Sequence, residues 1–239
     1  MMRLNKFIAT SGVASRRDAD KYIFNGYVTV NGRVVTEPGT QVNEFNDVVK
    51  LNNKKIVLSK KKKYIKLYKP AGFLSSIDKK DKLPNLLTLV KLQPGVKPLG
   101  RLDFNTEGLL ILTNDGDFIY KMSHPKFEVP RRYYVKIWGT LSDEELEKIT
   151  TGVNIGKGVV VKLDGIESGK ILKSTSWWFV VVHEGKYHEI KKIFEAVNHK
   201  VVRLIRLSFG DIELGNLKIK ESRNFSKEEL TFVRKVKKG

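Results

Sequence analysis

The segment from Gly100 to Gly116 reads GRLDFNTEGLLILTNDG and is the most informative stretch of the chain. Leu109–Leu112 is a short apolar run that predicts a buried strand, and Asn114-Asp115-Gly116 predicts the turn that ends it. Asp103 stands in the short loop before this strand. Such a loop holds a side chain against a rigid scaffold and leaves it reachable. Asp103 is therefore a candidate catalytic carboxylate.

Two other interpretations of this segment stay open on the residues alone. In the first, Asp103 is an ordinary turn residue paired with Arg101. In the second, Asp103 and Glu107 are the paired carboxylates of a glycosidase. We favour the second less, because Glu107 leads directly into Gly108 and the apolar run, where a capping or exposed position suits it better. Asp115 is most simply a turn residue.

Around this segment, the C-terminal part of the chain alternates strand-like and helix-like patterns. Ser142 and Glu145 form a capping box at the start of one helix, and Ser226 and Glu229 cap the last one. The irregular alternation predicts an α+β fold with a mixed, largely antiparallel sheet flanked by helices. Strands are expected over 64–68, 109–112, 133–138 and 177–182, and helices over 142–150 and 190–197.

The N-terminal part predicts a smaller unit of two helices followed by short strands. Gly12 ends the first helix and Ser15 caps the second, while Asn31-Gly32 is a strong hairpin signal. The run 60–63 consists of four lysines, whose mutual repulsion favours an exposed linker. We therefore expect a binding module over 1–59, a basic linker over 60–63 and a catalytic domain over 64–239.

The composition favours a polyanionic partner. The chain has 45 Lys and Arg against 26 Asp and Glu, a net charge of +19, and no cysteine. This charge suits nucleic acid, although a basic soluble surface and a membrane surface are the alternatives. Disulfides and thiolate zinc sites are excluded, and a reducing compartment such as the cytoplasm is expected. No apolar stretch is long enough to span a membrane, no N-terminal signal region is present, and the four histidines lack metal-site spacing.

The N-terminal segment resembles the S4 RNA-binding domain over essentially its full length. The matching stretches are Arg3–Lys6, Gly12–Arg17 and Gly26–Gly32, in the same order and spacing. S4 domains bind structured RNA through the second helix and the hairpin. The resemblance therefore implies that the cations of these elements bind RNA, namely Arg3, Lys6, Arg16, Arg17, Lys21 and Arg33.

The rest of the chain, to about Leu230, resembles the RsuA-type family of ribosomal RNA pseudouridine synthases. The family implies a cofactor-free, metal-free isomerase that converts a uridine of ribosomal RNA to pseudouridine, acting on naked RNA or on an assembling ribosomal subunit. A monomer is expected because the partner is large. Four blocks carry the resemblance: Lys69–Gly72, Gly100–Gly116, Arg131–Tyr133 and Glu184–Lys192.

The resemblance also implies roles for individual residues. Asp103 matches the nucleophile, Tyr133 the tyrosine that stacks on the base, and Lys191 the cation that pairs with the aspartate. The three are therefore predicted to converge in one basic cleft. The alternatives are a core position for Tyr133 and a solvent-facing one for Lys191. The residues expected to bind the substrate are Arg101, Lys69, Lys186 and His188.

Some positions depart from the family pattern. Many relatives have Arg-Asn-Arg-Gln where this chain has Lys186–Glu189, and arginine in place of Lys191. Lysine keeps the charge but loses bidentate geometry, and Glu189 adds a negative charge near the site. The run Lys186–His188 looks like small-subunit enzymes and much of the remainder like large-subunit enzymes, so we expect a large-subunit uridine, with a small-subunit one as the alternative. The main rival function is a non-catalytic RNA-binding protein of ribosome assembly on the same fold.

Overall fold

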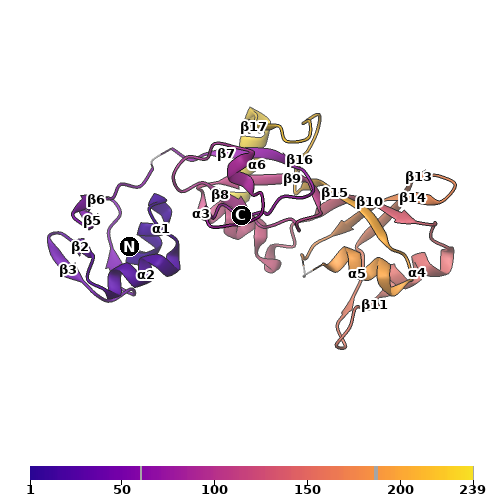
Figure 1. Cartoon of the computed structure of the whole chain (residues 1–239), viewed down its shortest axis with the longest axis horizontal. Helices are drawn as coiled ribbons and strands as arrows, with labels where there is room; N and C mark the ends of the chain where they lie inside the picture. Colours follow the sequence, from indigo (N-terminus) through magenta and orange to yellow (C-terminus); the bar gives the residue numbers. More distant parts are fainter. Residues whose placement is uncertain (60, 186–187, 239) are drawn as a thin grey trace. The chain divides into compact units, whose positions relative to one another are not determined.

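The computed structural model describes residues 1–59, 61–185 and 188–238 and divides into two compact units (Figure 1). The first unit contains Met1–Tyr64 together with Leu92–Lys97 and Thr113–Gly116. The second contains Ile65–Lys91, Pro98–Leu112 and Asp117–Gly239. Two short segments of the later sequence thus belong to the N-terminal unit, a partition that local sequence patterns do not suggest.

The first unit is built from two helices and a small sheet, as expected. Helix α1 (Leu4–Ser11) ends at Gly12, whose φ of +81° suits glycine. Helix α2 (Arg16–Phe24) begins at Ser15, whose hydroxyl accepts a hydrogen bond from the backbone N–H of Asp18. The strands are β1 (Met2–Arg3), β2 (Val28–Val30), β3 (Arg33–Val35), β4 (Gln41–Val42), β5 (Val49–Leu51) and β6 (Lys54–Lys55).

The hairpin of this unit follows the sequence signal closely. Asn31 and Gly32 both have positive φ, 51° and 84°, as the tight turn between β2 and β3 requires. The sheet order is β3-β2-β5-β6, and β1 pairs separately with β4. Apolar residues of both helices and of the strands form one core, which includes Leu4, Ile8, Ile23, Val28 and Val49.

The second unit is organised around one mixed sheet, in the order β13-β14-β10-β15-β9-β7-β17. Every pairing with a determined direction in this sheet is antiparallel except β15 with β9, which is parallel. Strands β8 and β16 pair with β9 and β15 at the side, and β11 pairs with β12. Their bounds are β7 (Tyr64–Lys69), β8 (Lys97–Leu99), β9 (Glu107–Thr113), β10 (Arg131–Trp138), β11 (Val153–Asn154), β12 (Val160–Val161), β13 (Gly165–Ile171), β14 (Thr175–Val182), β15 (Val201–Phe209), β16 (Ile212–Glu213) and β17 (Ser222–Asn224).

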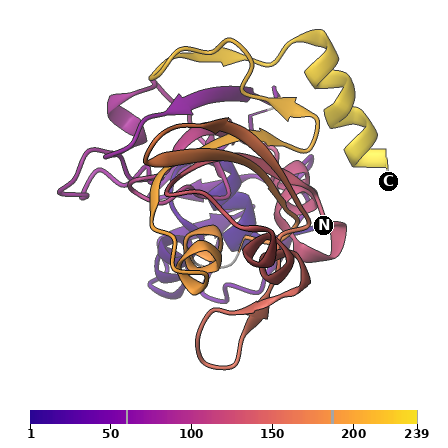
Figure 2. The same ribbon diagram turned by 90° about the vertical axis from the view of Figure 1, so that its right-hand side faces the viewer.

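Helices cover this sheet, and two of them lie on one face of its β13–β15 half. Figures 1 and 2 both show α4 and α5 on the same side of these strands. Ser142 and Glu145 form the expected capping box of α4, and Ser226 and Glu229 cap α6. The helices are α3 (Gly116–Ser123), α4 (Asp143–Thr151), α5 (Glu189–Ala196) and α6 (Lys227–Lys238), with short 3-10 turns η1 (Leu86–Thr88) and η2 (Pro125–Phe127).

The α+β fold with a mixed, largely antiparallel sheet is therefore confirmed. Leu109–Leu112 is fully buried within β9, as its apolar run predicts. Strand β15, at the centre of the sheet, was not expected from the sequence. Among the described residues, no helix is both long and apolar enough to cross a membrane.

Candidate active site

Asp103 lies in the loop between β8 and β9, and hydrogen bonds from the segment after β7 hold this loop in place. The hydroxyl of Ser75 accepts a hydrogen bond from the Leu102 N–H at 3.0 Å and donates one to the Leu102 carbonyl at 2.7 Å. The N–H of Gly72 donates to the Phe104 carbonyl at 2.8 Å. The segment that follows β7 thus holds the residues on both sides of Asp103.

Lys69, the last residue of β7, holds the same loop through hydrogen bonds from its side chain. Its side chain is completely buried, and its ammonium group donates to the carbonyls of Pro70, Asp103, Phe104 and Thr106 at 3.0, 3.1, 3.3 and 2.8 Å. The expectation that Lys69 contacts the substrate does not fit this position. Its nitrogen is occupied by backbone, and the side chain does not line the cavity beside Asp103.

Burial also changes the acid–base behaviour of Lys69. Loss of hydration lowers the pKa of its ammonium group to about 8, with smaller opposing contributions from Asp103 and Glu107. The cations Lys191 and Arg206 lower this pKa further. The loop that carries Asp103 therefore rests on a buried cation with a pKa close to neutral pH.

Lys191 and His188 contact the carboxylate of Asp103 directly. The Lys191 Nζ lies 3.3 Å from Oδ2, and the His188 Nε2 lies 3.5 Å from the same oxygen. Among the described residues, no hydrogen bond or ion pair to the other oxygen, Oδ1, is present. About a third of the Asp103 side chain is exposed. The carboxylate is thus anchored through one oxygen and leaves the other available.

Helix α5 positions both of these side chains. Lys191 is in its first turn, and His188 is its N-cap residue with φ 55° and ψ 27°. This left-handed backbone conformation is uncommon for residues other than glycine and is several-fold enriched in histidine. The apolar face of α5, including Ile193 and Phe194, is buried. The Lys191 side chain is 24% exposed and contacts Asp103, so Lys191 is not the solvent-facing helix charge that was the alternative.

A cavity of about 500 Å³ opens beside Asp103 in the second unit. Tyr133 lines it from β10 and is 8% exposed, and Arg101 lines it from the Asp103 loop. The predicted convergence of Asp103, Tyr133 and Lys191 is therefore present. Other lining residues come from the segment after β7, from the end of β14 and from α5, and include Ser75, Ser76, Thr106, Glu184, His188 and Glu189.

Two buried arginines flank Tyr133. Arg206 on β15 is paired directly with Tyr133 on β10. Arg131 precedes Tyr133 by two residues on β10, so all three side chains lie on one face of the sheet. Both guanidinium groups lie over the Phe209 ring, at 4.6 Å for Arg131 and 5.1 Å for Arg206. Burial lowers the pKa of Arg131. Two buried positive charges thus lie next to Tyr133, although neither guanidinium group lines the cavity itself.

Glu107 does not behave as expected from the sequence. It is 8% exposed, and both of its oxygens accept hydrogen bonds of 2.8 Å from Arg203. A bidentate pair of this kind raises the pKa of the Arg203 guanidinium. Glu107 is therefore neither a cap nor an exposed residue, and it is engaged by Arg203 rather than paired with Asp103 as a second catalytic acid.

Other carboxylates do line the cavity. Glu184 precedes α5, and Glu189, in its first turn, is buried. Both interact electrostatically with Arg131. Sequence reasoning noted Glu189 only as an added charge and did not single out Glu184.

Asp115, expected to be a simple turn residue, is also different. It is completely buried and accepts a 2.6 Å hydrogen bond from the Tyr64 hydroxyl. The neighbouring Asn114 side chain accepts from the Lys63 N–H at 2.8 Å and donates to the Lys61 carbonyl at 3.1 Å. The turn after β9 thus anchors residues 61–64 within the first unit.

The residues expected to bind RNA all belong to the first unit, and all are exposed: Arg3, Lys6, Arg16, Arg17, Lys21 and Arg33. Lys97 joins this set without having been predicted. Burial lowers the pKa of its ammonium group, and the positive charges of Arg16 and Lys6 lower it further. Lys97 is 81 residues or more from Arg16 and Lys6 in the sequence, so local sequence patterns did not reveal it.

Lys186, which was also expected to bind the substrate, lies outside the described residues. The buried Thr106 hydroxyl lines the cavity and has no hydrogen-bond partner among the described residues, so it suits a bound water or a substrate atom. Within the same part of the chain, no cluster of three or more His, Asp or Glu residues is arranged to hold a metal ion.

Comparisons with known proteins agree on one family. The family model described as RNA pseudouridylate synthase matches residues 63–196, and the S4 domain model matches residues 2–49. Ribosomal large subunit pseudouridine synthase B of Bacillus subtilis (strain 168) is 37% identical over 238 residues, which cover 98% of this chain and 96% of that protein. An uncharacterized RNA pseudouridine synthase of Aquifex aeolicus (strain VF5) is 38% identical over 231 residues, covering 96% of this chain and 92% of that protein.

A solved structure extends the agreement to three dimensions. The crystal structure of a pseudouridylate synthase superposes with a TM-score of 0.67 and 26% identity, covering 99% of this chain and 100% of that one. The range matched by the family model, 63–196, contains Asp103, Tyr133 and Lys191, the three residues that meet at the cavity. The chain therefore belongs to the RNA pseudouridylate synthase family and carries an N-terminal S4 domain.

Proposed function

We propose that the protein isomerises a specific uridine of ribosomal RNA to pseudouridine, with Asp103 as the nucleophile. The observation that carries this proposal is the 3.3 Å contact of the Lys191 ammonium group with Asp103, at a cavity that Tyr133 also lines. The large subunit is the favoured source of the uridine, because the Bacillus subtilis relative is named for that subunit.

The geometry suits a nucleophilic step by one oxygen of Asp103. Lys191 and His188 both hold Oδ2, so Oδ1 is the oxygen that attacks, either at the ribose C1′ or at the uracil ring. The bond between N1 and C1′ breaks, the base turns, and a bond forms between C5 and C1′. The bond between Oδ1 and the substrate breaks again, which restores the free carboxylate. C5 loses a proton and N1 gains one, so the isomerisation has no net redox change and consumes no water. A neighbouring cation keeps such a carboxylate ionised and oriented.

The other cavity residues suit the handling of a base that has left its stack. Flipping costs a few kcal/mol, which contacts in the pocket must offset. Tyr133 presents its ring to the cavity and stacks on the uracil, while Arg101 holds the flipped nucleotide or fills the gap that it leaves. His188, 3.5 Å from Asp103, is close enough to contact the substrate as well.

A division of labour between the two parts of the chain completes the proposal. Residues 1–59 bind RNA through their exposed cations, 60–63 are a linker, and 64–239 carry out the reaction. The partner is ribosomal RNA or an assembling ribosomal subunit. The protein works as a monomer in the cytoplasm.

The test is incubation of the purified protein, without cofactors, with unmodified ribosomal RNA transcripts from the large subunit and from the small subunit. Pseudouridines are mapped by carbodiimide-dependent primer extension, and Asp103→Asn serves as the isosteric control. We expect one new stop in the large-subunit transcript with the wild-type protein and none with Asp103→Asn.

Other outcomes identify the rival functions. Tight RNA binding without any new stop, on transcripts and on assembling particles alike, would indicate a binding protein. Release of free uracil would instead indicate a hydrolase that uses Glu184 or Glu189 as its second acid, since both line the cavity.

A further inference from the structure

A closed loop between β7 and η1 begins at the cavity and ends in a basic tip. Leu74, Ser75 and Ser76 line the cavity. The loop is closed at its base, where the Leu74 N–H donates to the Pro84 carbonyl at 2.8 Å and the Leu86 N–H donates to the Ser76 carbonyl at 3.1 Å. We call residues 77–84 the lysine loop. Its base is therefore fixed at the mouth of the active site.

The acidic side chains of the lysine loop are used to build it. Asp78 Oδ1 accepts a 2.9 Å hydrogen bond from the Lys80 N–H, and Asp81 Oδ2 accepts one of the same length from the Asn85 side chain. Asn85, which is buried, also donates to the Asp78 carbonyl at 2.7 Å. The two carboxylates are thus committed to the turn itself.

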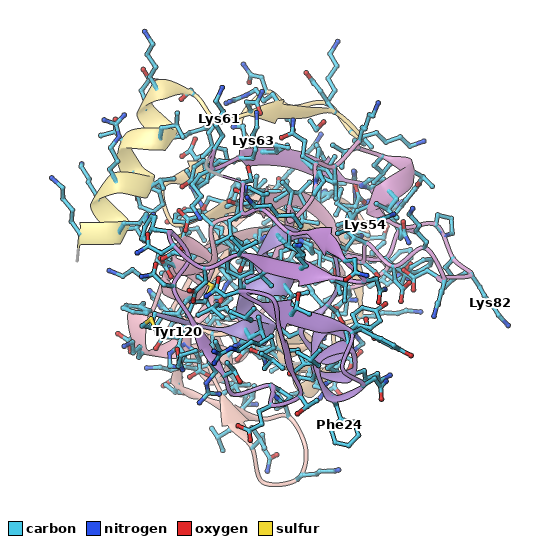
Figure 3. All side chains as sticks on the ribbon, turned by 90° about the vertical axis from the view of Figure 1, so that its left-hand side faces the viewer. Phe24, Lys54, Lys61, Lys63, Lys82 and Tyr120 are labelled. Atoms are coloured by element: carbon cyan, nitrogen blue, oxygen red, sulfur yellow. The ribbon has the colours of Figure 1, made fainter. Side chains whose placement is uncertain are left out.

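The lysines of the loop point to solvent instead. Lys79, Lys80 and Lys82 are all exposed, and Figure 3 shows Lys82 extending away from the ribbon. Within the part of the chain that the structure describes, none of these three side chains has a hydrogen bond or an ion pair. Lys220 adds a fourth exposed cation at the base, where its ammonium group lies 6.0 Å from the centre of the Phe73 ring.

We propose that the lysine loop binds the phosphate backbone of the substrate RNA beside the target uridine. This inference rests on the proposed function, because it takes the cavity as the place where the flipped uridine is held. A nucleotide in the cavity brings its flanking phosphates to the rim. The lysine loop starts at that rim and carries three exposed lysines that have no ion pair among the described residues. Lysine is a point-charge donor that binds phosphates without reading sequence. The loop therefore supplies affinity and register and leaves base recognition to the cavity.

Neutralisation of the loop tests the proposal. The variant with Lys79→Gln, Lys80→Gln and Lys82→Gln is compared with a matched control, Lys162→Gln, Lys170→Gln and Lys173→Gln. The control lysines are equally exposed, do not line the cavity and carry the same total charge. We expect the loop variant to raise KM on the order of tenfold at moderate salt, and to lower the slope of log K against log salt by about 2–3. The single-turnover rate at saturating RNA should change less than twofold.

A second measurement tests the position of the contact. The chain has no cysteine, so Lys82→Cys introduces a unique thiol that can carry a photoactivated crosslinker, with Lys173→Cys as the control. We expect crosslinks from position 82 to nucleotides within a few positions of the modified uridine. Crosslinks from position 173 should be weaker and elsewhere.

The proposal is overturned if both triple variants lose affinity equally, or if the crosslinks from position 82 avoid the neighbourhood of the uridine. Failure of the proposed function looks different, because the wild-type protein then forms no pseudouridine. In that case the salt slopes of RNA binding by the two triple variants still decide whether the lysine loop contacts RNA.

Discussion

At the scale of single residues, the pair of Lys191 with Asp103 makes the sharpest prediction for catalysis. Replacing Lys191 by Met removes the cation from Oδ2, and we expect the single-turnover rate to fall roughly 100-fold. Lys191→Arg keeps the charge with a different donor geometry, and its loss should be tenfold or less. Both rates are measured at saturating RNA, with affinity measured separately by filter binding.

RNA affinity is the control for the two Lys191 variants, because each should bind RNA with an affinity within about threefold of the wild-type affinity. A Lys191→Met protein that turns over at the wild-type rate would show that the ion pair is structural. A loss of affinity equal to the loss of rate would instead assign Lys191 to substrate binding.

Lys69 makes a prediction about pH. Its ammonium group supplies three protons to four carbonyls around Asp103, and burial lowers its pKa to about 8. Above that pH one donor is lost and the loop is held less firmly. We expect the single-turnover rate to fall between pH 7 and 9.5 with an apparent pKa of about 8. Lys69→Arg, which stays charged, should lack this fall even if its rate is lower throughout.

The same group should affect stability with the opposite sign. The folded-state pKa is about 8, against 10.5 for ordinary lysine, so between these values the unfolded chain binds more protons than the native one. The free energy of unfolding therefore rises with pH in this window, by up to about 3 kcal/mol. Urea unfolding at pH 7.5 and 10, followed by the fluorescence of Trp138, Trp177 and Trp178, measures this rise. In Lys69→Met the contribution should disappear.

At this scale, the sequence predicted the position of Lys191 beside Asp103 but not the burial of Lys69. The resemblance placed Asp103, Tyr133 and Lys191 together, and the cavity confirms that they meet; their roles stay predictions. Lys69 was expected at the substrate because the Lys69–Gly72 block matches the family, and a lysine before Pro-Ala-Gly gives no sign of burial. Only the tertiary arrangement brings four carbonyls around its nitrogen.

At the scale of elements, the parallel pairing of β9 with β15 depends on Gly108. Gly108 has φ +104°, and a Cβ atom there would lie 2.3 Å from the Arg206 carbonyl oxygen and 2.6 Å from the Arg206 nitrogen. Both atoms are backbone and cannot move aside. We expect Gly108→Ala to cost about 3 kcal/mol of stability and to lower the Tm by roughly 10 °C.

Gly116→Ala is the matched control, because Gly116 opens α3 and has no atom within 4 Å of the added methyl group. Its Tm should stay within about 2 °C of wild type. An unchanged Tm for Gly108→Ala would mean that β9 and β15 can separate without harm to the sheet, contrary to the close approach described above.

Local signals predicted many elements, and non-local pairing explains the rest. Caps and turns such as Ser142, Ser226 and Asn31-Gly32 act within a few residues, so the sequence located them correctly. Strand β15 was missed, and its place between β10 and β9 joins segments far apart in the chain. Glu107 was misjudged for the same reason, since its partner Arg203 lies on that strand.

At the scale of the whole molecule, two groups of cations stand out in a chain with a net charge of +19. In the second unit, Lys191 and Arg101 line the cavity, and three buried cations lie next to residues that line it: Lys69, Arg131 and Arg206. The exposed cations of α1, α2 and β3 belong to the first unit and lie outside the residues that line the cavity. We infer that the first set serves the reaction and the second holds the RNA.

This division predicts that affinity and rate can be changed separately. Neutralising α2 with Arg16→Gln, Arg17→Gln and Lys21→Gln should weaken RNA binding at least tenfold at 0.15 M salt and lower the salt slope by about 2–3. The single-turnover rate at saturating RNA should stay near wild type. The control is Lys50→Gln, Lys54→Gln and Lys55→Gln, which removes equal charge from exposed positions on β5 and β6 of the same unit (Lys54 is marked in Figure 3). Equal weakening by both variants would mean that the first unit attracts RNA only through its net charge, and that α2 is not a binding element.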